Sequence, residues 1–356
     1  MNLSLKLLPA ARFAVRGFTL IELMIAMLLG LVVIAGVSSI FLANQQTYRS
    51  NEALSEVQDG ARVAFELLAR DIRVAGLSGC NSTNGRVANV LNPSATNWFA
   101  DWGNALHGYD DASTDPALSG LTGNGAPVAS TSSNPSNSVH ILSTQPIDAV
   151  LQDNKGGDPA SFKITAPTTD LTTGGGDVVV ICDYDHATIV QTTNYNGNIT
   201  VVHNSGNSVS PGNCTKDLNY YPNLPGGADC NSHGPIPQFP GGANIAKLSG
   251  HVWYIGVNSQ ASSGKSLYRL NAVSSATGIT VTPQEMVRNV TSMQIKYLQP
   301  PSATKFDIAT NMTNWATVDS AQVTLTLQSS FQRAGTDSKP LMRKFTTTAT
   351  VRNRVN

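Results

Sequence analysis

The distribution of hydrophobic residues over the first 80 positions predicts one very long helix. Residues 18–43 form an apolar run of 26 residues in which Glu22 is the one charged side chain. A helix of roughly 20 residues crosses a bilayer, so this run is long enough to span a membrane. Residues 1–17 contain three cations and no acid. Because positively charged flanks stay on the cytoplasmic side, we expect the rest of the chain to lie across the membrane.

An amphipathic pattern continues the predicted helix through residues 44–79. Apolar side chains recur there at steps of three and four, which is the spacing of one helix face. No proline occurs between Pro9 and Pro93, and Gly76 and Gly79 mark the expected helix end. The predicted buried face consists of Leu54, Val57, Ala61, Ala64, Leu68, Ile72 and Ala75.

Short β-branched runs and alternating segments then predict a β-rich globular head over residues 80–356. Two hairpins are expected, with turns at residues 184–186 and 258–265. A helix followed by strands favours an α+β fold in which an antiparallel sheet covers the second half of the helix. Residues 81–137 and 204–243 are rich in glycine and polar residues, and we predict loop-like insertions there. The expected strands are 138–143, 177–183, 187–193, 251–257, 266–270, 290–299, 321–328 and 344–351.

Composition narrows the possible partners and excludes disorder as the state of the head. Lys and Arg total 23, Asp and Glu also total 23, and charged residues make up 13 % of the chain. This balance provides no basic surface, so no nucleic-acid partner is expected. Recurring apolar segments at near-zero net charge are not typical of a disordered tail.

The sequence contains no motif that indicates catalysis, a metal or a cofactor. Nucleophile-elbow, zinc-protease and phosphate-loop motifs do not occur, and the six histidines are scattered. The glycine-rich stretch 172–177 could bind phosphate, but a flexible lead into a strand is the favoured interpretation because no helix follows it. Trp98, Phe99 and Trp102 could contact a ligand, but a local core is favoured.

Four cysteines, Cys80, Cys182, Cys214 and Cys230, indicate disulfides. Their spacing contains no C-x-x-C pair, and an even number in an exported chain is typical of an oxidising compartment. Three connectivities are possible. We favour Cys214–Cys230, which closes a short loop, and Cys80–Cys182, which joins the helix end to a strand. Reduced thiols are the alternative.

The segment Arg16-Gly17-Phe18-Thr19-Leu20-Ile21-Glu22 resembles the signal of type IV pilins and of the related type II secretion pseudopilins. The resemblance implies that a prepilin peptidase cuts between Gly17 and Phe18 and methylates the new amino terminus of Phe18. It also implies that Glu22, the fifth residue of the mature chain, pairs with the amino terminus of a neighbouring subunit. A type IV pilin-like fold is the corresponding expectation: a long N-terminal helix packed on an antiparallel sheet with long loop insertions.

Patches beyond the helix resemble the large minor pilins called PilW. These patches are the helix end 75–80, the strand pair 176–191, the hairpin 253–269 and the stretch 286–297. The resemblance implies a subunit that helps to initiate pilus assembly near the tip and supports motility or adhesion. A minor, J-like pseudopilin of a type II secretion system is the alternative, and a membrane-tethered enzyme is a more distant one.

The resemblance also implies partners and a location. Expected partners are major and other minor pilins, the prepilin peptidase, the assembly platform of the inner membrane, and membrane lipid. The expected location is the bacterial inner membrane, with the head in the periplasm, and then the pilus on the cell surface.

Overall fold

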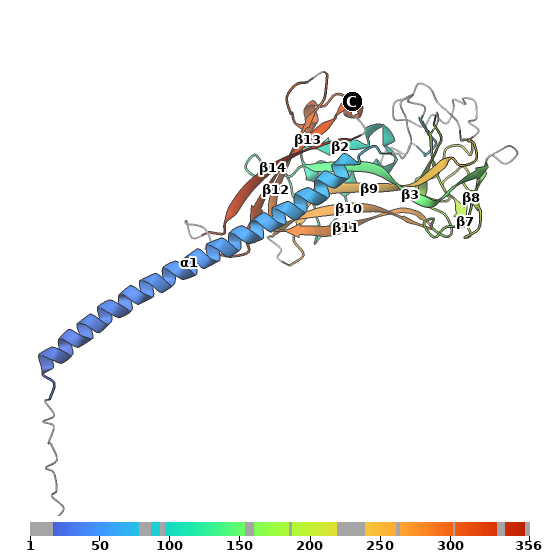
Figure 1. Ribbon diagram of the computed structural model, residues 1–356. Helices are drawn as coiled ribbons and strands as arrows, with labels where there is room; N and C mark the ends of the chain where they lie inside the picture. The colour runs from blue at the N-terminus through green and yellow to red at the C-terminus, as the bar shows by residue number, and fades with distance from the viewer. Residues whose placement is uncertain are drawn as a thin grey trace, which may run out of the picture. The chain divides into compact units, whose positions relative to one another are not determined.

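The computed structural model describes nine parts of the chain and divides it into two compact units. The described residues are 17–77, 87–92, 97–153, 160–184, 187–218, 239–260, 264–301, 303–332 and 339–352. The first unit comprises Met1–Glu52 and the second comprises Ala53–Asn356. One helix, α1 (Leu20–Arg73), begins in the first unit and ends in the second (Figure 1).

Helix α1 confirms the long helix expected from the sequence, and its C-terminal end has local causes. Arg70 and Arg73 lie in the last turn, where cations are favoured by the helix dipole. The chain then reaches Gly76, whose φ of 71° is readily adopted only by glycine. The Gly76 N–H donates to the carbonyl of Leu142 at 2.7 Å, which directs the chain away from the helix axis.

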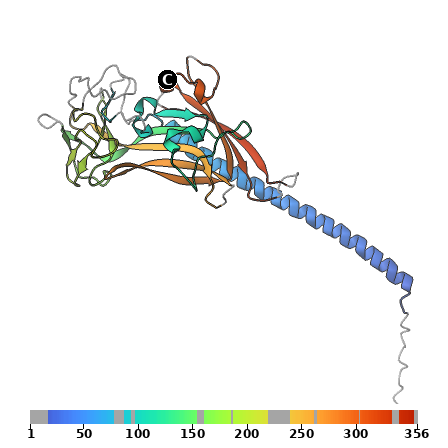
Figure 2. The same cartoon turned by 180° about the vertical axis from the view of Figure 1, so that it is seen from behind.

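The second unit buries the predicted apolar face of α1 with one correction. Leu54 is only half-buried, and the neighbouring Ala53 takes the buried position at 0 % exposure. Figures 1 and 2 show this part of α1 from opposite sides, with strands against one side of it. The helix residues in the main core of the head are Val57, Ala61, Ala64, Leu68, Ala69 and Ile72, and Ala75 joins this core just after the helix end.

An eleven-stranded sheet forms the larger part of the head. Its central strand is β9, which pairs with β3, β5 and β10, and every pairing in the sheet is antiparallel except β1 with β6. Both predicted hairpins, β5–β6 and β9–β10, are confirmed. The strands are β1 (Val87–Asn89), β2 (Leu106–Tyr109), β3 (Ser138–Asp153), β4 (Ser161–Ile164), β5 (Val178–Cys182), β6 (Ala187–Gln191), β7 (Asn194–Tyr195), β8 (Thr200–Val202), β9 (Asn244–Val257), β10 (Lys265–Ser275) and β11 (Gly278–Arg288).

A second, three-stranded sheet has the order β12 (Val290–Leu298), β13 (Ser320–Gln328) and β14 (Met342–Thr350). The alternation predicted for β13 is observed: Val323, Leu325 and Leu327 are buried, and the residues between them are partly exposed. The inner face of this sheet and the strands β3, β9 and β10 contribute to the same core as α1. The head is therefore one α+β unit of the type IV pilin-like kind, built around the second half of the helix.

The described part of residues 81–137 contains more regular structure than the sequence indicated. Strands β1 and β2 join the large sheet through β6 and β3. Phe99 is 5 % exposed and packs in a small core with Trp98 and Trp102, as the local-core interpretation predicted. Short 3-10 helices are η1 (Trp98–Ala100), η2 (Trp102–Asn104), η3 (Ala112–Thr114), η4 (Pro116–Leu118), η5 (Ala309–Asn311) and η6 (Trp315–Thr317).

The glycine-rich stretch before β5 forms a closed turn and leads into the strand, as favoured from the sequence. Gly174, Gly175 and Gly176 all have φ near +90°, which glycine adopts without strain. The buried carboxylate of Asp177 closes the turn, because it accepts bonds from the backbone N–H and the hydroxyl of Thr172. The ammonium group of Lys247 lies 2.7 Å from the same carboxylate and balances its charge.

Candidate processing and assembly site

The predicted cleavage site lies just outside α1. Residues 17–19 have no regular structure, and the helix begins at Leu20. The Phe18 side chain is 90 % exposed. A Cβ placed on Gly17 would meet no atom within 4 Å, so the fold itself does not require glycine there. A requirement for glycine at this position would therefore come from an enzyme that reads the segment.

Thr19 and Glu22 form a reciprocal capping box at the start of α1. The hydroxyl of Thr19 accepts a hydrogen bond from the Glu22 N–H at 3.3 Å. In return, Glu22 Oε2 accepts bonds from the N–H and from the hydroxyl of Thr19, both at 2.9 Å. This exchange satisfies backbone donors that a helix leaves unpaired at its first turn. This cap was not predicted from the sequence, although the spacing T-x-x-E before an apolar run is its usual signal.

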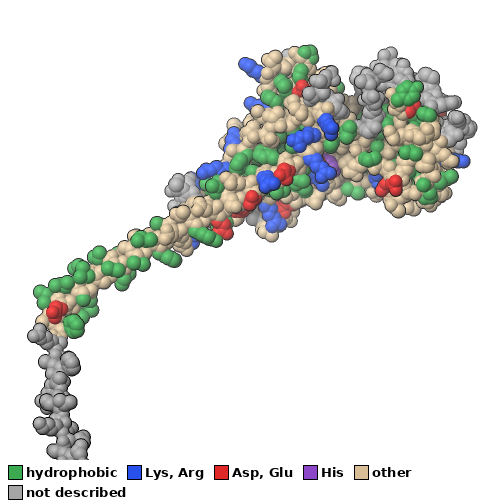
Figure 3. All heavy atoms as spheres, viewed as in Figure 1, with side chains coloured by type: hydrophobic (Ala, Val, Ile, Leu, Met, Phe, Trp, Pro, Cys, Tyr) green, Lys and Arg blue, Asp and Glu red, His purple; other side chains and the backbone are tan. Residues whose placement is uncertain are grey.

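The apolar part of α1 that follows the capping box is not buried by any other described residue. Its most hydrophobic 18-residue window has a mean hydropathy of 2.7, and none of that window is buried in the chain. Figure 3 shows hydrophobic side chains along this part of the helix and charged side chains along its continuation in the second unit. By length and composition this segment is able to cross a membrane.

A buried acid fixes the other half of α1 to the head. Asp71, on the helix, is 8 % exposed and accepts a hydrogen bond from the indole N–H of Trp253 at 2.9 Å. Arg269 lies 3.7 Å from the same carboxylate and stacks over the Trp253 ring at 5.8 Å from its centroid. Because Asp71 is far from Trp253 and Arg269 in sequence, its role was not predicted.

Glu56 provides a second polar attachment for the helix. One carboxylate oxygen accepts from the Asn289 amide at 3.3 Å, and the other accepts from the backbone N–H of Ser330 at 3.0 Å. Asn289 is the junction between β11 and β12 and has a φ of 62°. Glu56 therefore connects α1 to the chain segments beside both sheets.

A buried histidine and serine share one acid inside the head, but their order differs from that of a hydrolase triad. His140 Nε2 lies 2.8 Å from Asp115 Oδ1, and the Ser138 hydroxyl donates to the other oxygen of Asp115. In a catalytic triad the histidine stands between the serine and the acid. Here the acid stands between the other two, and all three side chains are at most 5 % exposed.

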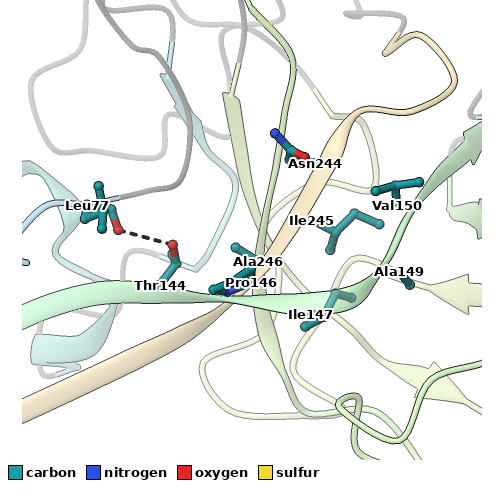
Figure 4. A pocket seen from close by; sticks show the side chains of 9 residues that line it. All are labelled: Leu77, Thr144, Pro146, Ile147, Ala149, Val150, Asn244, Ile245 and Ala246. Atoms are coloured by element: carbon teal, nitrogen blue, oxygen red, sulfur yellow. Dashed lines mark hydrogen bonds between the residues drawn. The ribbon is translucent and has the colours of Figure 1, made fainter.

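A pocket of about 320 Å³ lies beside the point where β3 and β9 change register (Figure 4). Its two polar side chains are Thr144 and Asn244, and Thr144 donates to the carbonyl of Leu77 at 3.1 Å. The lining contains no titratable side chain. The other lining residues are Leu77, Pro146, Ile147, Ala149, Val150, Ile245 and Ala246.

Two of the four cysteines belong to the described residues. Cys182 ends β5 and is 2 % exposed, and Cys214 donates its backbone N–H to the Val90 carbonyl at 2.9 Å. Neither is a free thiol. Cys80 and Cys230 lie outside the described residues, so the favoured pairing stays a prediction. Among the residues that the structure describes, no group of three or more His, Cys, Asp or Glu side chains is placed to hold a metal ion.

Comparison with known proteins supports the interpretation of the N-terminal segment. Residues 12–38 match the family model described as the prokaryotic N-terminal methylation motif. The match includes Gly17, Phe18, Thr19 and Glu22. It covers the start of the chain and not the head.

A curated relative extends this similarity. The chain is 36 % identical over 69 residues to "Pilin-like protein PilA3" of Thermus thermophilus. The match covers 19 % of this chain and 30 % of the relative, so it spans less than a third of either protein. No solved structure matches the chain. The motif and this relative together support a place in the type IV pilin family.

Proposed function

We propose that this protein is a minor pilin of the PilW-like kind, which helps to initiate assembly of a type IV pilus. The observation that carries the proposal is the Gly17–Phe18 step, exposed and outside the helix, directly before a capped apolar helix with an acid in its first turn. The methylation motif at residues 12–38 supports cleavage at this step. The subunit would be a substrate and a building block, not an enzyme.

The charge of Glu22 gives the assembly step a physical basis. Cleavage after Gly17 would create a cationic amine on Phe18, next to an apolar helix. An isolated ion in an apolar medium is costly, whereas a carboxylate on a neighbouring subunit would pair with it. A contact between the amine of one subunit and the acid of the next is heterologous, and such contacts repeat into open helical filaments.

The exposed apolar helix and the large head suggest where each part of the subunit would lie and what it would contact. Helix residues 20–43 would lie in the inner membrane before assembly and against other pilin helices afterwards. The partners that we propose are major and minor pilins, the prepilin peptidase and the assembly platform. The head, which has its own core, would face the periplasm and then lie near the pilus tip, where it would support motility or adhesion.

Deletion of the gene separates this proposal from its main alternative, a minor pseudopilin of a type II secretion system. We expect the deletion strain to lose surface pili and twitching while it still secretes type II substrates normally. Normal pili together with lost secretion would contradict the pilus role and support the pseudopilin. Complementation with the unmutated gene is the control for effects on neighbouring genes.

A further inference from the structure

The capping box at Thr19 fixes where α1 begins relative to the cleavage site. The first intrahelical bond runs from the Leu23 N–H to the Thr19 carbonyl at 3.1 Å. Gly17 and Phe18 therefore lie directly before the cap and outside the helix. The Thr19 hydroxyl accepts a hydrogen bond from the Glu22 N–H, and the Glu22 carboxylate accepts one from the Thr19 N–H. Two backbone donors of the first turn therefore already have partners.

Without this cap, the helix has a route to extend toward the N-terminus. In an extended helix the Ile21 N–H would donate to the Gly17 carbonyl, following the i to i−4 pattern. That carbonyl belongs to the peptide bond that must be hydrolysed. The sequence between Pro9 and Gly17 contains no proline, so Gly17 alone would oppose the extension, and a helix tolerates a single glycine at modest cost.

We infer that Thr19 is a positioning residue for leader removal: it ends the helix so that the Gly17–Phe18 bond stays in non-helical chain that the peptidase can bind. This inference rests on the proposed function, because it assumes cleavage at that bond. In the reaction water adds across the peptide bond, the carboxyl group remains on Gly17, and the amine remains on Phe18. Thr19 takes no part in the bond making or breaking.

The inference makes Thr19 and Glu22 separable by substitution. Thr19→Val keeps the size and β-branching of the side chain but removes the hydroxyl that accepts the Glu22 N–H. Thr19→Asn changes the shape but restores a good N-cap acceptor. Glu22→Gln keeps an acceptor at the third helical position and removes the charge. Each variant changes one property of the capping box and retains the others.

The test follows leader removal from the full-length chain, co-expressed with the prepilin peptidase, by pulse-labelling and mass determination. Loss of an N-cap shifts the equilibrium between a helix that starts at Leu20 and a longer one by about fivefold, so we expect Thr19→Val to slow cleavage by up to about fivefold. Thr19→Asn and Thr19→Ser should be cleaved at nearly the unmutated rate. Glu22→Gln should also be cleaved normally, even where it no longer assembles.

Two outcomes would overturn the inference without affecting the proposed function. In one, Thr19→Val is processed as fast as the unmutated chain. In the other, Thr19→Asn is as slow as Thr19→Val although Asn restores an N-cap acceptor, which would mean that the peptidase reads the threonine side chain itself. Failure of the unmutated chain to lose its leader at all would instead contradict the proposed function.

Discussion

The two carboxylate oxygens of Glu22 have different surroundings. Oε2 accepts both bonds from Thr19, whereas Oε1 makes no hydrogen bond in the described part of the chain. A carboxylate oxygen can accept more than one donor. Glu22 is therefore able to cap its own helix and still present an oxygen to a cationic amine of another subunit.

Replacement of Glu22 by Gln tests the pairing separately from the cap. The amide still accepts from Thr19, so we expect normal protein levels and normal leader removal. The charge needed for the amine is gone, so incorporation into pili should fall at least about tenfold, since loss of one partner leaves the other ion unpaired. Immunoblots of sheared pili measure incorporation, and immunoblots of whole cells measure the protein level and leader removal. Unchanged incorporation of Glu22→Gln and of Glu22→Val would show that the pairing hypothesis is wrong.

Asp71 should contribute more to stability than other acids of the same helix. Asp71→Ala leaves the buried indole N–H of Trp253 without its acceptor, and we expect the free energy of unfolding to fall by about 1–3 kcal/mol. Glu66→Ala is the matched control, because the Arg62–Glu66 pair at 3.0 Å is largely exposed. Exposed pairs of this kind contribute little to stability, because water and salt screen them. Denaturant unfolding of the purified chain in detergent compares Asp71→Ala with Glu66→Ala. Equal losses in the free energy of unfolding would contradict the role given to Asp71.

Two histidines predict how stability depends on pH. Burial lowers the pKa of His107 and of His251 below the ordinary value of 6.5. His140 lowers the pKa of His107 further, whereas for His251 the Asp71 carboxylate opposes the effect of burial and Arg269 adds to it. The unfolded chain therefore binds these protons more readily than the folded chain does below about pH 6.5. It follows that the free energy of unfolding falls as the pH drops from about 6.5 through the lowered pKa values, and is flat above that range.

Thermal midpoints measured between about pH 7.5 and pH 5 test this dependence. His251→Gln should make the dependence of the thermal midpoint on pH shallower, because one of the two histidines with a lowered pKa is removed. His233→Gln, at a histidine outside the described residues, is the comparison variant. A midpoint that rises on acidification over this range would contradict the assignment.

At the scale of elements, the second half of α1 combines small residues with a few large ones. Ala61 and Ala64 lie at the contact with the strands, and a Cβ on Gly60 would lie 3.1 Å from the Leu327 side chain. This spacing lets the helix approach β13 closely. Leu68, at 1 % exposure, supplies one of the largest side chains in the contact.

Paired truncations measure how much this contact stabilises the head. Leu68→Ala removes a fully buried side chain, and we expect it to cost about 2–5 kcal/mol. Val63→Ala changes the same helix at a position that is 47 % exposed, so its effect should stay below about 0.5 kcal/mol. Similar losses for the two variants would mean that this face of α1 is not packed on the strands as described.

The elements that were predicted correctly have strong local patterns. Strands β12, β13 and β14 begin and end within two residues of the expected bounds, because their inner faces alternate with polar residues. Strand β11 was missed because it pairs only with β10, is mostly exposed, and contains Pro283. Strand β3 runs on through Pro146 to sixteen residues, where the sequence indicated a short strand.

The residues of the candidate site also divide into those with a local sequence signal and those without one. Gly17, Phe18 and Glu22 could be predicted as processing and assembly residues because their signal lies within seven consecutive residues. The contact of Asp71 with Trp253 joins positions 182 residues apart, and no local pattern reports such a pairing. The predicted disulfides Cys80–Cys182 and Cys214–Cys230 differ in the same way, because the first joins positions far apart in sequence and the second closes a short loop.

At the scale of the whole molecule, the two units differ in how their apolar surface is covered. The head buries its apolar side chains in several cores of its own. The described part of the chain provides no such cover for the apolar helix segment of the first unit. An exposed apolar surface of this extent is stable only against lipid or against other apolar helices. A subunit that passes from a membrane into a filament core would contact lipid first and other apolar helices afterwards.

The proposed removal of residues 1–17 would leave the molecule slightly acidic, in line with the absence of nucleic acid from the proposed partners. Loss of Lys6, Arg12 and Arg16 reduces Lys and Arg from 23 to 20, against an unchanged 23 Asp and Glu. A subunit with this balance has no general electrostatic attraction for phosphate backbones. Partner choice would then depend on the amine–acid contact and on the surface of the head.

The most direct test of the account is the amino terminus of the mature protein. Intact-mass and peptide mass spectrometry of the protein purified from its own cells, in membranes and in sheared surface material, determines it. The account predicts a chain that lacks residues 1–17 and begins at an N-methylated Phe18. A chain that still begins at Met1, in cells with an active prepilin peptidase, would contradict the central claim.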